Sequence, residues 1–98
     1  MPDPGNMSAF RGEIDKVYII QVTGAVTGGG LWGTDKYTDD SSLAMAAVHC
    51  GILKPGQKGL VKVTIRTGAI HYPGSTRNGV TSSDFGAFGG SYRIVAAP

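Results

Sequence analysis

The chain has 98 residues, enough for one domain with a single hydrophobic core. No apolar run approaches the ~20 residues of a membrane-spanning helix, and the single cysteine, Cys50, excludes a disulfide within the chain. Residues 1–50 carry three basic and six acidic side chains, whereas residues 51–98 carry six basic and one acidic side chain. A basic half of this kind attracts anionic partners, although an ordinary solvated surface is the alternative explanation.

The first twelve residues read as a polar arm with two prolines, and we expect one domain over residues 13–98. The arm has no basic segment followed by an apolar stretch, so no signal peptide is visible. Val17–Thr23 is apolar and β-branched, which predicts a strand. The glycine-rich residues 24–30 end that strand, and the chain's sixteen glycines predict many tight turns.

Residues 40–50 predict a helix of about three turns. Four consecutive side chains offer candidate N-cap oxygens: Asp39, Asp40, Ser41 and Ser42. Residues 43–48 include no polar side chain, so the surrounding structure must enclose this helix on most sides. Gly51 is suited to end the helix because it adopts positive φ at no steric cost.

The second half of the chain predicts β-structure. In residues 60–66 apolar side chains alternate with Lys62, Thr64 and Arg66, which therefore share one face of a strand. Residues 69–72 predict a further short strand, Asn78-Gly79 predicts a tight turn, and residues 91–96 predict the closing strand. The expected fold class is α+β, with one central short helix wrapped by mostly antiparallel strands.

No pattern of side chains supports an enzyme. The glycines at positions 28, 30 and 33 have the spacing of a dinucleotide-binding loop, but no helix begins at Gly33. His49 and Cys50 are adjacent on a helix and point about 100° apart, so they do not form a nucleophile–base pair. The three His and Cys residues lack a metal-ligand spacing. We therefore expect no cofactor and no metal site.

Four side chains with aromatic rings leave a structural and a functional interpretation open. Trp32 is favoured as a core residue over a sugar-stacking one, and His49 as a structural residue that bonds backbone near the helix end. Tyr37 and Tyr72 fit a core position and a sugar-stacking surface equally well.

Two segments stand out: LWGTDKYTDDSSLAMAAVHCGI at residues 31–52 and YPGSTRNGVTS at residues 72–82. Together they resemble the LCCL domain, a small extracellular module, and further similarity extends the match over residues 17–95. The resemblance implies a central helix wrapped by antiparallel β-structure, a non-catalytic role, and extracellular recognition that includes lipopolysaccharide binding and host defence. Animal members carry four cysteines in two disulfides, one of them in the helix where this chain has Ala44, so the chain resembles a disulfide-free, microbial version.

Two functional hypotheses follow. The first is a recognition module for an anionic glycan or lipopolysaccharide-like surface, at the cell surface or outside it, with no nucleic-acid partner and no membrane span. Its expected ligand-binding residues are Lys62, Arg66, Tyr72, Arg77 and Tyr37, and its expected structural residues are Trp32, His49, Asn78 and Gly79. The alternative is a structural or self-assembling subunit that forms homo-oligomers through the N-terminal arm or its sheet edges.

Overall fold

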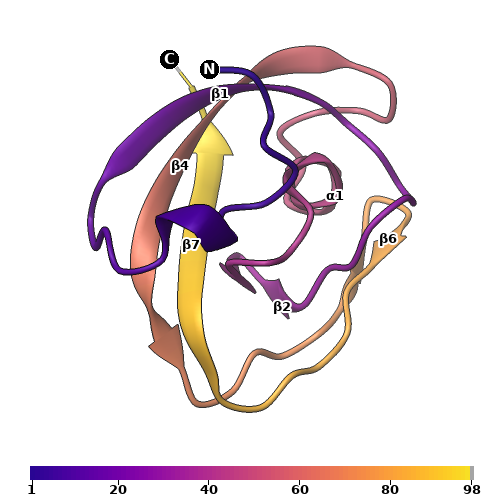
Figure 1. Ribbon diagram of the computed structural model, residues 1–98. Coiled ribbons are helices and arrows are strands. Elements are labelled where there is room, and N and C mark those ends of the chain that lie inside the picture. The colour runs from indigo at the N-terminus through magenta and orange to yellow at the C-terminus, as the bar shows by residue number, and fades with distance from the viewer. Residues whose placement is uncertain (98) are drawn as a thin grey trace.

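In the computed structural model, which describes residues 1–97, a curved five-stranded sheet wraps around one short helix (Figure 1). The strands lie in the order β1-β4-β7-β3-β2 and all of their pairings are antiparallel. Their bounds are β1, Val17–Thr23; β2, Gly33–Thr34; β3, Lys36–Thr38; β4, Lys58–Ala69; and β7, Phe88–Ala96. A separate hairpin pairs β5, Thr76–Arg77, with β6, Val80–Thr81. The predicted α+β class is confirmed.

The helix α1, Leu43–His49, is the centre of the core. Six of its seven side chains are buried, and only Ala44 is partly exposed. Burying Leu43 or Val48 contributes about 1.5–3 kcal/mol each. The helix has two turns rather than the predicted three, because Ser42 is already its N-cap and Gly51, with φ +84°, lies just past its end. The apolar composition of this segment therefore predicted the burial of the helix correctly, but the predicted helix was too long.

The strand predicted at Val17–Thr23 matches β1 from end to end, whereas β4 and β7 extend beyond the residues predicted for them. β4 runs to Ala69, so the separate strand predicted at residues 69–72 is wrong; only Tyr72 pairs there, in an isolated bridge with Phe85. The turn prediction is confirmed, since Asn78 and Gly79 both have positive φ, 53° and 79°. The two-residue strand β2 and the three-residue strand β3 were not predicted, because so few residues carry no periodic pattern.

The first twelve residues pack onto the rest of the domain. They include a short 3-10 helix, η1, at Ser8–Phe10, and the side chain of Met7 is fully buried in the core. Arg11 donates two hydrogen bonds of 2.7 Å to the carboxylate of Asp39, whose side chain is 1% exposed. The bond with Asp39 raises the pKa of Arg11. Asp39 thus anchors the N-terminal segment and is not a helix cap.

No helix in the described part of the chain has the length and apolar character needed to cross a membrane.

Candidate binding surface

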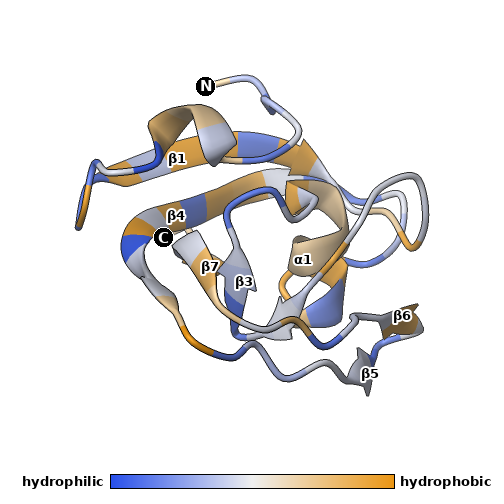
Figure 2. Ribbon diagram, turned by 60° about the horizontal axis from the view of Figure 1, so that its bottom comes forward, coloured by the Kyte–Doolittle hydropathy of each residue, from blue (hydrophilic) through white to orange (hydrophobic). Residues whose placement is uncertain are grey.

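The outer face of the sheet, on the side away from α1, combines apolar and basic side chains. Strand pairing aligns Ile19 of β1, Lys62 of β4 and Val95 of β7 in one row across three strands. Ile19 is 42% exposed and Val95 53% exposed, while Lys62 between them is half-buried. Along β4, apolar and polar residues alternate, as the bands of Figure 2 show. The aliphatic part of Lys62 therefore lies among apolar neighbours and its ammonium group extends toward water.

A second row adds two cations beside the first. Val17, Thr64, Arg93 and Lys36 are aligned across β1, β4, β7 and β3. Among residues 1–97, Lys36, Lys62 and Arg93 form no ion pair within 4 Å. We call these two rows, together with the 53% exposed Leu60, the basic outer face. Its unpaired cations give it a positive potential beside exposed hydrocarbon.

Lys62 and Arg66 are on the same face of β4, as the alternation predicts, but they differ in their partners. Arg66 forms an ion pair with Asp15, at the start of the segment that leads into β1. Arg77, in the β5–β6 hairpin, donates to Asp35 at 2.9 Å. Both pairs are exposed to solvent, so each contributes little to stability. Lys62 is the predicted binding residue whose charge remains unpaired.

Tyr37 and Tyr72 are not at the surface. Their exposed fractions are 0% and 1%, so neither ring offers a face for stacking a sugar, which corrects the surface interpretation. The hydroxyl of Tyr72 donates to the Phe88 carbonyl at 3.0 Å and accepts from the Ala69 amide at 2.9 Å. Burial raises the pKa of Tyr37. Both tyrosines therefore belong to the packing of the domain.

His49 joins the helix to the loop that precedes the β5–β6 hairpin. Its Nε2 lies 3.1 Å from the Ser75 carbonyl oxygen, so this nitrogen donates, and its Nδ1 accepts from the Tyr37 hydroxyl at 2.8 Å. The Asn78 side-chain amide donates to the His49 carbonyl at 3.0 Å. His49 and Asn78, two of the expected structural residues, thus meet at the C-terminal end of α1, and Gly79 completes the turn after Asn78.

Trp32 and Cys50 are both partly buried. The indole of Trp32 lies against Gly30, where any Cβ would overlap the ring, and it meets Phe85 edge-on with ring centroids 6.4 Å apart. Burial raises the pKa of the Cys50 thiol, which lowers its reactivity. The part of the chain that the structure describes has no cluster of three His, Cys, Asp or Glu side chains placed to hold a metal ion.

Sequence reasoning missed Arg93 and Lys36 as members of the basic outer face. The signal for Arg93 was present, because Tyr92 and Ile94 alternate with it in the closing strand. The signal for Lys36 was absent, since β3 is too short for a period and gains its orientation from pairing with β7.

Comparison with known proteins identifies the family. The family model of the LCCL domain matches residues 7–92. The transcriptional regulatory protein rxt3 of Schizosaccharomyces pombe is 43% identical over 56 residues, which cover 53% of this chain. The human cysteine-rich secretory protein LCCL domain-containing 2 is 38% identical over 68 residues, or 67% of this chain. The matches span only 16% and 14% of those two proteins. Because the family match covers most of its length, the chain belongs to the LCCL domain family, a family of non-catalytic modules.

Proposed function

We propose that the chain is a non-catalytic recognition module that binds an anionic glycan or lipopolysaccharide-like surface through its basic outer face. The row of Ile19, Lys62 and Val95 carries this proposal, because an unpaired ammonium group stands between two exposed apolar side chains. Phosphate and carboxylate groups are the natural partners of an ammonium. The apolar neighbours suit the sugar rings or acyl chains to which such groups are attached.

The neighbouring cations support a polyanionic ligand. Arg93 and Lys36 are on adjacent strands, and adjacent strands lie about 4.8 Å apart. A polyanion can therefore contact several of these cations at once. The carboxylate of Asp15, at the margin of this face, is neutralised by Arg66. Because Arg93 is exposed and the Lys62 ammonium group extends toward water, binding should weaken as salt increases.

The relatives support a recognition role without fixing the ligand. One is named as a secretory protein and the other as a transcriptional regulatory protein, and each is several times longer than its matched region. The same domain thus occurs in proteins of different roles. This distribution fits a binding module attached to different partners better than it fits one conserved reaction.

Isothermal titration calorimetry with lipopolysaccharide and with polygalacturonate, at low and high salt, tests the proposal. We expect binding at low salt that weakens at high salt, and a loss of about tenfold or more in a variant carrying Lys62→Gln and Arg93→Gln. Lys54→Gln removes one exposed charge from the loop between α1 and β4 and is the control. Absence of binding at low salt, or an equal loss in the control, would contradict the proposal.

A second candidate function, homo-oligomer formation, rests on the edge of β1. The N-terminal segment covers part of that edge: Gln21 donates to the Met1 carbonyl, and Pro2 forms a bridge with Gln21. The arm therefore pairs with its own chain, and Val17, 45% exposed, lies on the uncovered part. If this edge joins two copies, light scattering will show a concentration-dependent dimer that Val17→Lys abolishes. A monomer at every concentration excludes this candidate.

A further inference from the structure

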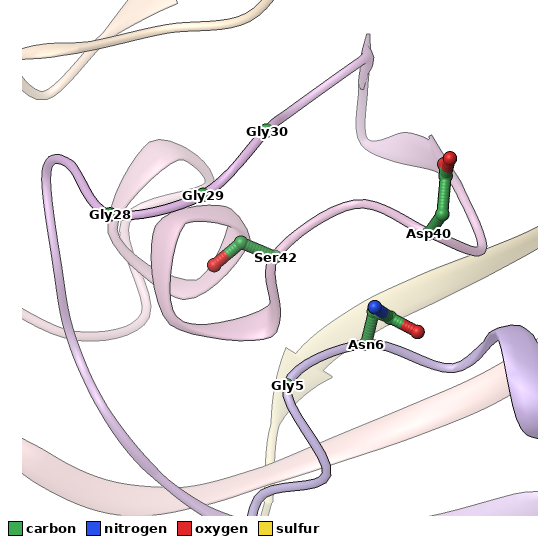
Figure 3. A pocket seen from close by; sticks show the side chains of 7 residues that line it. All are labelled: Gly5, Asn6, Gly28, Gly29, Gly30, Asp40 and Ser42. Carbon is green, nitrogen blue, oxygen red and sulfur yellow. The ribbon is translucent and has the colours of Figure 1, made fainter.

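A second surface feature, separate from the basic outer face, is a small cavity beside the start of α1. Its volume is about 240 Å³, and three chain segments line it: Gly5 and Asn6, the glycines at 28, 29 and 30, and Asp40 with Ser42 (Figure 3). This is below the ~300–1,000 Å³ typical of pockets for drug-sized ligands. An occupant would therefore be about one ring in size.

Hydrogen bonds hold the three segments together. The Ser42 amide donates to the Gly30 carbonyl at 2.8 Å, and the Leu43 amide donates to the Gly5 carbonyl at 3.0 Å. The segment from Asp40 to Ser42 thus runs between the glycine run and the N-terminal segment, as Figure 3 shows. The four glycines keep the space free of side chains; a Cβ at Gly29 would come within 3.0 Å of the Ser42 Cβ.

Several polar groups of the cavity have no partner within residues 1–97. The Asp40 carboxylate forms neither a hydrogen bond nor an ion pair. Asn6 uses only its oxygen, as an acceptor from Ser8, so its side-chain NH2 is free. The Ser42 hydroxyl accepts from Met45 and keeps its own proton to donate. The amides of residues 28–30 also make no hydrogen bond there.

The chemistry of these groups selects the class of ligand. They combine one carboxylate acceptor with amide and hydroxyl donors, and no cation lines the cavity. An anion would meet the Asp40 carboxylate, so charge disfavours it. Adjacent sugar hydroxyls both donate and accept, so they can use the carboxylate and the amides together. The half-buried Trp32 indole does not line the cavity but packs against Gly30, which does.

We propose that this cavity binds one neutral sugar unit, with Asp40 and Asn6 bonding its hydroxyls. The site goes beyond the proposed anionic recognition, because it lies at the start of α1 and carries the opposite charge. A glycan could contact both sites, but neutral-sugar binding does not depend on the basic outer face.

Titration of the full chain with glucose, galactose, mannose and N-acetylglucosamine tests the proposal. Trp32 is the only tryptophan, so its fluorescence reports on the surroundings of Gly30, one of the lining residues. We expect a saturable, salt-independent response to at least one sugar at millimolar concentration, with chemical-shift changes at the amides of residues 28–30. Asp40→Asn, which breaks no contact within residues 1–97, should weaken this binding about tenfold.

The controls separate this site from the basic outer face. Asp35→Asn removes an exposed carboxylate elsewhere and suits the positive φ of that residue, so it should leave sugar binding unchanged. Lys62→Gln should also leave it unchanged while it weakens lipopolysaccharide binding. Gly29→Ala should reduce sugar binding with the fold retained by circular dichroism. No saturable response to any of the four sugars, an unchanged affinity in Asp40→Asn, or the same response to calcium chloride alone would overturn the proposal.

Discussion

The side chains of Tyr37 and His49 show how single polar groups are accommodated inside this domain. Both residues have 0% exposure, and the Tyr37 hydroxyl lies 2.8 Å from His49 Nδ1. The other ring nitrogen of His49 bonds the Ser75 carbonyl, so each polar atom of the imidazole has a partner. Across residues 1–97 no buried side-chain nitrogen or oxygen lacks a hydrogen bond. Since an unpaired buried group costs about 1–3 kcal/mol, removal of one partner should be measurable.

Tyr37→Phe removes the hydroxyl and leaves His49 Nδ1 buried without a donor. We expect the free energy of unfolding to fall by about 1–3 kcal/mol, measured as a lower urea midpoint with an unchanged slope. Tyr18→Phe is the matched control, because the Tyr18 hydroxyl bonds Glu13 at a partly exposed position. Equal losses in the two variants would show that burial of the pair is not the cause.

At the scale of elements, glycines and apolar patterns predicted the whole of β1 and the central residues of α1, β4 and β7. Gly51 and Asn78-Gly79 were informative because positive φ is a local requirement that few residues meet. The contact between Arg11 and Asp39 joins residues 28 positions apart, so no local pattern indicates it. The burial of Tyr37 and Tyr72, and with it the composition of the candidate site, likewise depends on which strands meet in space. The sequence analysis therefore identified Lys62 for the basic outer face. It overlooked the alternation that indicates Arg93, and it had no signal for Lys36, which the pairing of β3 with β7 places there.

The start of α1 gives a test at this scale, because the sequence offers four candidate caps. The structure selects Ser42, whose hydroxyl accepts from the Met45 amide at 3.2 Å. Ser42→Ala should lower the free energy of unfolding by about 1 kcal/mol, whereas Asp40→Ala should change it by less than ~0.5 kcal/mol. Thermal unfolding of the two variants measures both effects. A larger loss of stability in Asp40→Ala than in Ser42→Ala would show that Ser42 is not the residue that caps the helix.

At the scale of the whole molecule, the N-terminal segment is part of the core rather than an appendage. Met7 is fully buried, and the match to the family begins at the same residue. The segment also closes the inner side of the sheet, where Phe10 packs against Tyr18 with ring centroids 4.7 Å apart. The domain therefore needs these residues for its stability.

Met7→Ala should leave a cavity and lower the free energy of unfolding by about 2–5 kcal/mol, the usual cost of deleting a large buried side chain. Met1→Ala, at a residue that is 45% exposed, is the control and should cost less than ~0.5 kcal/mol. Chemical denaturation of both variants provides the measurement. Equal stability of the Met7 variant and the wild type would show that the segment is dispensable.

The position of β7 also has a consequence for folding during synthesis. This strand is formed by residues 88–96, yet it lies in the middle of the sheet, between β4 and β3. A nascent chain can pair β1 with β4 early, but it cannot connect that ribbon to β3 until its final strand has left the ribosome. Assembly of the sheet must therefore wait for β7, and chains stalled shortly before β7 should expose the apolar side of both halves to chaperones.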